Sequence, residues 1–234
     1  MLSKLALAAS ALILFPLAAS AGETAAWSDG AYAGVTAGVG RGNSALNFDD
    51  NYWELEDAYG DVTGHTTAYA VGVGAGYNWV RGNFLVGTEA DLSHIGFNTS
   101  DSDSHVGEYD PGERAIIGQK VSMLSTARLR AGYIHNSAVF YVTGGVAMTM
   151  NDVTMVDGGS DGNSKTRDRV WAPGWAVGAG SECAMSENWT SKIEYLHVAT
   201  SQKAGTTESS EGETFHSTAK FNADIVRVGL NYRF

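Results

Sequence analysis

The segment from Thr67 to Trp79 alternates between two kinds of residue. Tyr69, Val71, Val73, Ala75, Tyr77 and Trp79 occupy one parity, while Ala70, Gly72, Gly74, Gly76 and Asn78 occupy the other. Residues of one parity share a face of a β-strand. A soluble sheet carries Lys, Glu and Thr on its outward face, whereas here one face is wholly apolar and the other is small or polar. This inverted pattern is typical of a strand that crosses a membrane.

Seven further segments repeat the alternation over about the 9–11 residues that a tilted membrane strand needs. They are centred on Ala33–Val39, Phe84–Leu92, Ala127–Tyr133, Tyr141–Met148, Trp175–Cys183, Trp189–Tyr195 and Val226–Phe234. No stretch after residue 21 approaches the length of an apolar membrane helix. Eight is an even number, as a closed barrel with both termini on one side requires. We therefore predict an all-β protein, an eight-stranded antiparallel up-and-down transmembrane β-barrel.

The connections between these segments alternate in length. Short turns are expected at Arg81–Asn83, His135–Ser137 and Ser186–Asn188, and long loops at about Arg41–Thr66, Asn98–Gln119, Asn151–Val170 and Thr200–Lys220. Outer-membrane barrels have short periplasmic turns and long extracellular loops in the same alternation. The long loops are rich in Gly, Ser, Asn and Asp, which are typical of exposed connections.

The chain begins with an export signal. Met1 to Lys4 form a short positively charged start, Leu5 to Ala18 are apolar apart from Ser10, and Ala19-Ser20-Ala21 has the small-residue pattern that signal peptidase recognises. The apolar run is shorter than the roughly 18–20 residues of a spanning helix. We predict a signal peptide over residues 1–21 and an outer-membrane β-barrel domain over residues 22–234.

Composition excludes several other classes of protein. Only 18% of the residues are charged, 44% are hydrophobic, and 29 of 234 are glycine, which argues against disorder and coiled coil. The 15 basic residues against 26 acidic ones exclude a basic nucleic-acid binder. Eighteen of the acids and seven of the bases fall in the four long loops, which therefore carry the whole net charge of −11. The single cysteine excludes a disulfide framework.

Motifs in the second half of the chain resemble a known family. They are Ser125–Tyr133, Tyr141–Ala147, Gly174-Trp175, Gly178–Gly180 with Glu182, Asn188-Trp189 with Lys192, Glu194 and Tyr195, and Arg227–Phe234. In this order they resemble the small alphaproteobacterial outer-membrane barrels of the porin-family or outer membrane β-barrel domain type, which are OmpA/OmpX-like. The resemblance implies an eight-stranded barrel, but its members include surface immunogens and haemin-binding proteins, so the activity stays open. Cys183 departs from the pattern, because an aromatic residue is usual there.

Charged residues also fall on the inward parity of the predicted strands. They are Glu89, Asp91, Arg128, Arg130, Glu182, Lys192, Glu194 and Arg227. Buried charges persist only when they are paired and hydrogen-bonded, so we expect an ion-pair network along the lumen. An eight-stranded barrel is just wide enough for side chains to fill, which favours a packed polar interior of structural role. The alternative interpretation is a gated polar pore or proton path. Gly72, Gly74 and Gly76 are expected to make room for the long arginines opposite.

The strand ends carry two further signals. The family resemblance implies that Tyr232 and Phe234, which follow Val228 and Leu230 at a period of two, form the C-terminal pattern read by the outer-membrane assembly machinery. Aromatic residues near strand ends predict girdles at the two membrane interfaces. They are Tyr69, Tyr77, Trp79, Phe84, Tyr133, Trp175, Trp189, Tyr195, Tyr232 and Phe234.

No pattern in the sequence indicates a metal, cofactor or catalytic site. The six histidines are His65, His94, His105, His135, His197 and His216, and they show neither His-x-His nor His-Glu-x-x-His spacing. The pairs Ser93-His94 and His216-Ser217 could suggest a nucleophile beside a base. Adjacent strand residues point to opposite faces, however, which makes each pair a poor catalytic dyad. We predict that the protein is not an enzyme and holds no cofactor.

The function expected from these features is structural. We predict an outer-membrane protein of a Gram-negative bacterium that contributes to envelope integrity and to surface interaction through acidic extracellular loops. The alternative is a narrow porin-like channel or a haemin or ligand uptake protein. The partners expected are outer-membrane lipid and lipopolysaccharide, periplasmic chaperones, the assembly machinery and an extracellular ligand of the loops, with no nucleic acid. The barrel is expected to be a monomer or a weak lateral oligomer.

Overall fold

The computed structural model describes residues 27–48, 62–98, 114–159, 162–208 and 214–234. They form eight strands: β1 (Gly30–Phe48), β2 (Val62–Arg81), β3 (Phe84–Asn98), β4 (Arg114–His135), β5 (Ala138–Gly159), β6 (Gly162–Ala184), β7 (Trp189–Glu208) and β8 (Thr214–Arg233). Each strand pairs with its sequence neighbours, and β1 pairs with β8, so the sheet is a closed antiparallel barrel. The predicted fold class is confirmed. No helix in the described residues is long and apolar enough to cross a membrane.

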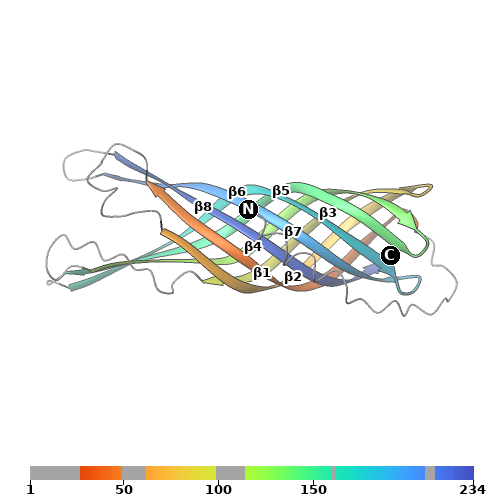
Figure 1. Cartoon of the computed structure of the whole chain (residues 1–234), viewed down its shortest axis with the longest axis horizontal. Coiled ribbons are helices and arrows are strands. Elements are labelled where there is room, and N and C mark those ends of the chain that lie inside the picture. Colours follow the sequence, from red (N-terminus) through yellow and green to blue (C-terminus); the bar gives the residue numbers. More distant parts are fainter. Residues whose placement is uncertain (1–26, 49–61, 99–113, 160–161, 209–213) are drawn as a thin grey trace, which may run out of the picture.

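The register determines how steeply the strands run. Following paired residues once around the barrel from Ala33 returns to Asn43 on the same strand, a stagger of ten residues. A stagger of this kind requires tilted strands, and Figure 1 shows them running obliquely along the long axis. Every side chain of inward parity therefore points toward one narrow interior.

The alternation of the sequence corresponds to the two faces of the sheet. Val35, Val73 and Leu129 are among the apolar side chains exposed on the outside, where lipid would cover them. Their neighbours in sequence are buried inside or are glycine. On β5, whose orientation the sequence left open, Val142 and Val146 point outward while Tyr141 points inward.

The three short turns agree with the sequence. They comprise residues 82–83, 136–137 and 185–188, at the same end of the barrel. Gly82 and Asn136 adopt left-handed φ values of 60° and 54°, a conformation that glycine and asparagine tolerate best. This end is periplasmic, because outer-membrane barrels place their short turns there.

The four long loops are shorter than predicted. Only residues 49–61, 99–113, 160–161 and 209–213 lie between strands, because the strands continue well past the length needed to cross the membrane. Figure 1 shows the strands extending beyond the barrel body at the end opposite the turns. Polar residues that the sequence assigned to loops therefore belong in part to strands. One of them, Asp152 on β5, is buried.

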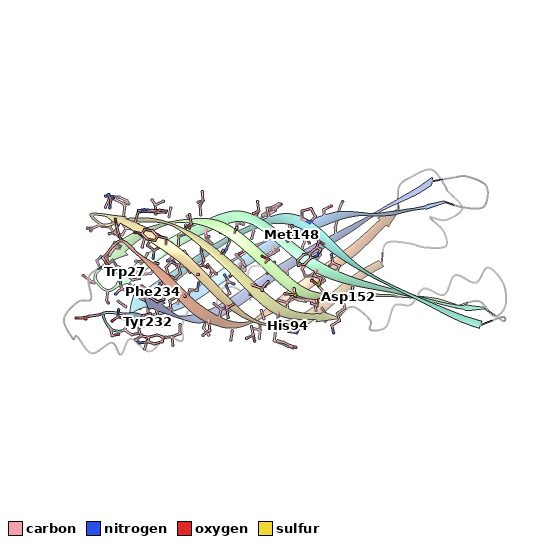
Figure 2. All side chains as sticks on the ribbon, turned by 180° about the vertical axis from the view of Figure 1, so that it is seen from behind. Trp27, His94, Met148, Asp152, Tyr232 and Phe234 are labelled. Atoms are coloured by element: carbon pink, nitrogen blue, oxygen red, sulfur yellow. The ribbon has the colours of Figure 1, made fainter. Side chains whose placement is uncertain are left out.

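Exposed aromatic side chains gather at two levels of the outer surface. All ten residues predicted for the girdles are exposed. Near the turns the rings of Trp189 and Tyr232 lie 5.2 Å apart and those of Tyr232 and Phe234 lie 5.3 Å apart. At the outer level Tyr69 contacts His94, with ring centroids 6.0 Å apart. Figure 2 shows Tyr232 and Phe234 toward one end of the barrel and His94 toward the other.

Candidate functional site: the closed interior

The middle of the barrel holds the eight charged side chains that the sequence placed on inward parities. Glu89 and Asp91 come from β3, Arg128 and Arg130 from β4, Glu182 from β6, Lys192 and Glu194 from β7, and Arg227 from β8. All eight residues are buried. The structure brings all eight together, because strands on opposite sides of so narrow a barrel face each other across its axis.

Arg128 and Arg227 form the centre of this group. Arg128 Nη2 lies 2.8 Å from Asp91 Oδ2, and its Nη1 lies 3.1 Å from Glu194 Oε1. Arg227 Nη1 lies 3.0 Å from Asp91 Oδ1, and its Nε donates to Glu194 Oε2 at 2.7 Å. Each guanidinium therefore bridges the same two carboxylates from a different strand. This arrangement satisfies most of the donors of both arginines without water.

The remaining charges extend the network toward the periplasmic end. Lys192 Nζ lies 2.9 Å from Glu89 Oε2, and Glu89 also pairs with Arg128. Arg130 Nη2 lies 2.7 Å from Glu182 Oε2. The group contains four acids and four bases, so its formal net charge is zero. Balanced pairing of this kind is what allows charges to remain in a site of low dielectric constant.

Two tyrosines enclose Arg130. Its guanidinium carbon lies 4.2 Å from the ring centroid of Tyr141 and 5.6 Å from that of Tyr32. Glycines provide the space, because a Cβ at Gly180 would lie 2.8 Å from the Tyr141 hydroxyl and a Cβ at Gly76 would lie 2.5 Å from the Tyr32 hydroxyl. The expectation that Gly72, Gly74 and Gly76 make room for arginines is therefore wrong. A Cβ at these positions would meet Ser93, Asp91 and Tyr32, respectively.

The interior toward the extracellular end is mostly apolar, although the polar side chains of Thr149, Asn151 and Thr200 are also buried there. Thirteen buried side chains form one hydrophobic cluster: Ala68, Ala70, Ile95, Phe97, Val121, Leu124, Ala147, Ala176, Leu196, Val198, Phe221, Ala223 and Ile225. The rings of Phe97 and Phe221 meet edge to face with centroids 5.3 Å apart. The predicted packed polar interior is thus only partly right, because an apolar layer lies above the ion pairs. We call this cluster the outer layer.

A second apolar cluster lies at the periplasmic end, and its key residue precedes the first strand. Trp27 is 9% exposed and packs with Leu85, Val139, Tyr141 and Ala184. Its indole Nε1 donates to the carbonyl oxygen of Ser137 at 3.3 Å. Figure 2 shows Trp27 at the same end as Tyr232 and Phe234. We call this cluster the inner layer.

The residues beside Trp27 hold it in place. The Arg233 guanidinium carbon lies 5.0 Å from the centroid of the Trp27 ring. Asp29 accepts a hydrogen bond from the Val80 backbone N–H at 2.6 Å and pairs with Arg81 at 3.1 Å. The Val80 hydrogen bond, and then the Arg81 side chain, lower the pKa of Asp29 below its ordinary value. The N-terminal segment is therefore tied to the end of β2, the β4–β5 turn and the last strand.

Other residues singled out in the sequence do not form a site. Ser93 is buried inside while His94 is exposed outside, so the two point away from each other. His105 lies outside the described residues, and of His65, His216 and Ser217 only the backbone is described. No group of three or more His, Cys, Asp or Glu residues within the described ranges could hold a metal ion. Cys183 is partly exposed, and its thiol is free.

Sequence reasoning missed both apolar layers. A signal for the outer layer was available, because Ile95, Phe97, Leu196 and Val198 are apolar residues on inward parities. Trp27 gave no such signal. It lies outside every alternating segment, and only the folded chain shows that the segment before β1 turns into the barrel mouth.

An apolar exterior, aromatic residues at both rims and an interior of paired charges define an outer-membrane β-barrel protein with eight strands. The sequence matches the family described as outer membrane protein beta-barrel domain over residues 7–234, and the chain belongs to that family. Its location is the cell outer membrane of a Gram-negative bacterium.

Named relatives are similar over most of the chain. The 31 kDa outer-membrane immunogenic protein of Brucella melitensis is 31% identical over 241 residues, covering 98% of this chain and 93% of the relative. The 22 kDa outer membrane protein of Rhizobium leguminosarum is 28% identical over 170 residues, covering 73% of this chain and 68% of the relative.

Two solved structures are similar in fold. The outer membrane protease OmpT from Escherichia coli is 12% identical with a TM-score of 0.48, covering 90% of this chain and 100% of that one. The attachment invasion locus protein Ail of Yersinia pestis is 11% identical with a TM-score of 0.40, covering 88% of this chain and 99% of that one.

Proposed function

We propose that this protein is a structural, non-conducting component of the outer membrane that contributes to envelope integrity and presents acidic extracellular loops for surface interaction. The observation that carries the proposal is the order of layers inside the barrel. The ion-pair network lies between the outer layer and the inner layer, so clusters of buried apolar side chains flank it on both sides. The polar side chains buried beside the outer layer are Thr149, Asn151 and Thr200. A conducting pore needs a continuous polar path.

The packing of charges supports the same role. Each of the eight charged groups of the network has an opposite charge in contact, and the largest fully buried side chains include Arg130, Glu182 and Glu194. Opening a pore would expose these pairs to water and break several of them together. The network therefore acts as a crosslink between β3, β4, β6, β7 and β8. A rigid barrel of this kind is a suitable base for loops that meet other molecules.

The route to the membrane belongs to the same proposal. Residues 1–21 direct export, and periplasmic chaperones carry the mature chain over residues 22–234. Tyr232 and Phe234 are exposed at the end of β8, where they are available to the assembly machinery. The folded barrel works as a monomer or a weak lateral oligomer in contact with outer-membrane lipid and lipopolysaccharide.

Single-channel recording tests the proposal. Mature protein of residues 22–234 is refolded, its folding is verified by heat-modifiable migration, and it is inserted in planar bilayers. We expect no discrete conductance. A stable open state of reproducible size would overturn the sealed-barrel account, and Arg128, Arg130, Glu182 and Glu194 would then be the residues to test for ion selectivity.

Haemin uptake is the competing function and needs a separate measurement. Haemin is added at micromolar concentration to the refolded protein, and the Soret band is recorded. The proposal expects no shift. A shift that is lost when His65, His105 and His216 are replaced together would assign the loops to haemin binding and would contradict a purely structural role.

A further inference from the structure

Methionine is concentrated on two neighbouring strands. Of the six methionines in the chain, one is the first residue and four lie on β4 and β5: Met123, Met148, Met150 and Met155. The remaining one, Met185, lies in the β6–β7 turn. Side chains are described for three of the four, Met123, Met148 and Met150. We call these three the thioether cluster.

The thioether cluster lies on the outside of the barrel. Leu124, which follows Met123 on β4, is buried inside, and so is Thr149, which separates Met148 from Met150 on β5. Residues that alternate with inward ones share the outward face of a strand. Met148 is 43% exposed, and the other two methionines are partly exposed. All three side chains therefore point to the same outer surface.

The register brings the three side chains next to one another. Met123 stands directly opposite Met150 in the β4–β5 ladder, and Ser125, two positions further along β4, stands opposite Met148. Directly opposed residues on one face have Cβ atoms about 4.5–5.5 Å apart, and diagonal neighbours stay within about 7–8 Å. Methionine is unbranched and has several rotatable bonds, so its sulfur can move toward a common point. Three thioethers can therefore meet above these two strands.

Irregular strand pairing surrounds Met123. The β4–β5 register shifts between Val121 and Met123, and the β3–β4 register shifts between His94 and Phe97. Bulges are frequent beside functional sites, because the extra residue re-aims a side chain. The ring of His94, which stands opposite Met123 on β3, lies toward Tyr69 with ring centroids 6.0 Å apart. This imidazole is engaged by a neighbour, which leaves the three sulfur atoms as the donor set.

The thioether cluster lies where the apolar surface meets a charged one. Asp152 is the next residue of the same parity after Met150, and it stands opposite the exposed Lys120 of β4. Figure 2 shows Asp152 farther from the periplasmic end than Met148. A dissolved ion can therefore reach the cluster from the extracellular side. Trp171 of β6 is exposed opposite Met150, and an indole face attracts cations.

We propose that Met123, Met148 and Met150 bind a soft monovalent metal ion of the Cu(I) class. Thioether sulfur is a soft donor that selects Cu(I), whereas Mg²⁺ and Ca²⁺ take oxygen ligands. Within the described residues no group of three or more His, Cys, Asp or Glu offers a harder metal an alternative. Binding involves no change of oxidation state. The inference goes beyond the structural role proposed above, and it holds whether or not the barrel conducts.

Titration with silver(I) tests the inference, because silver(I) is a soft monovalent ion that stays monovalent in air. Mature protein carrying Cys183→Ser, which removes the free thiol, is refolded in neutral detergent without chloride and titrated with silver nitrate. We expect native mass spectrometry to show one bound ion per barrel. With isotope-labelled methionine methyl groups, the NMR resonances of Met123, Met148 and Met150 should shift, whereas that of Met185 should not.

Leucine variants provide the matched comparison, because leucine keeps the volume of methionine but has no sulfur. Met150→Leu should weaken silver binding by at least about ten-fold, since even residues that only support a metal ligand contribute that much. The variant with all three methionines of the cluster changed to leucine should lose the site. Met185→Leu, in the exposed turn, is the control and should bind like the parent. Heat-modifiable migration verifies that each variant is folded.

Several outcomes would overturn the inference. Parent-like binding by the triple variant would do so, as would an equal shift of the Met185 resonance, which would indicate binding to any exposed thioether. Displacement of silver by millimolar zinc(II) would assign the ion to harder donors. Loss of binding in His94→Gln, together with parent-like binding by Met150→Leu, would assign it to the imidazole.

Discussion

Replacing Glu182 by glutamine tests the buried network most directly. Glu182 is 1% exposed, pairs with Arg130 at 2.7 Å and also accepts hydrogen bonds from Thr190 and Asn231. The amide keeps the shape but removes one of four negative charges, which leaves the interior with a net positive charge. Breaking a buried pair from one side costs about 3–5 kcal/mol.

The structure places the expected cost at the lower end of that range. Arg130 would keep Glu89, whose Oε2 lies 3.7 Å from Nη1, and the face of Tyr141. We therefore expect a loss of about 3 kcal/mol in the free energy of unfolding. With a urea m-value of about 1–3 kcal/mol/M, the midpoint should fall by about 1–3 M.

The assay is a urea titration of the refolded barrel in phospholipid vesicles, followed by tryptophan fluorescence and heat-modifiable migration. Glu187→Gln, in the exposed β6–β7 turn, is the matched control and should change stability by less than about 0.5 kcal/mol. The double variant Arg130→Met with Glu182→Met removes both charges and should be more stable than Glu182→Met alone. A parent-like midpoint for Glu182→Gln, or no recovery in the double variant, would refute the reasoning.

Four further outcomes are expected. Gly180→Ala should cost about 1–3 kcal/mol, because its Cβ would lie 2.5 Å from the Ile193 carbonyl oxygen and 2.8 Å from the Tyr141 hydroxyl. Gly144→Ala, whose Cβ would meet no atom of another strand closer than 3.7 Å, should be neutral in the same urea titration. Trp27→Ala should lower the midpoint by about 1 M or more, since it removes a buried ring; a parent-like midpoint would show that the inner layer contributes nothing. Deleting Phe234 should reduce the amount of barrel in isolated outer membranes while in vitro refolding persists, and equal amounts would exclude an assembly role. The pKa of Asp29 is lower in the folded protein than its unfolded value near 3.8. The stabilisation that Asp29 provides is therefore present above pH 3.8 and is lost as the pH falls through the folded pKa. The Trp27 indole N–H resonance should accordingly keep its folded chemical shift down to about pH 4.

Strand parity was predictable because a membrane exterior enforces it on every strand. Each outward residue from Val35 to Val228 must be apolar where lipid covers it, so a period of two persists in sequence. Inward charges are conspicuous against this background, which is why the residues of the network could be named. Their pairing could not be predicted, because it depends on a register that joins Arg128 on β4 to Glu194 on β7 across the barrel.

Strand ends were harder to predict for a physical reason. Beyond the membrane the apolar constraint on the outward face disappears, so Arg41, Asn43 and Lys220 look like loop residues although they are paired in strands. Inward residues then carry the packing, as Phe97 and Phe221 do. The outward pattern of apolar residues alone therefore predicts strand ends that are too early, and it gives no indication of the outer layer.

The network also constrains how the barrel closes. Asp91 and Arg227 are 136 residues apart, yet they form one of the central pairs, so the charges of β3 and β4 lack Arg227 until β8 is in place. Unpaired buried charges are costly, which means that incomplete barrels gain little from the earlier strands alone. The last strand thus has two faces with separate tasks: Tyr232 and Phe234 face outward, while Arg227 and Asn231 complete the interior. Closure of the barrel and neutralisation of its buried charges are therefore one event.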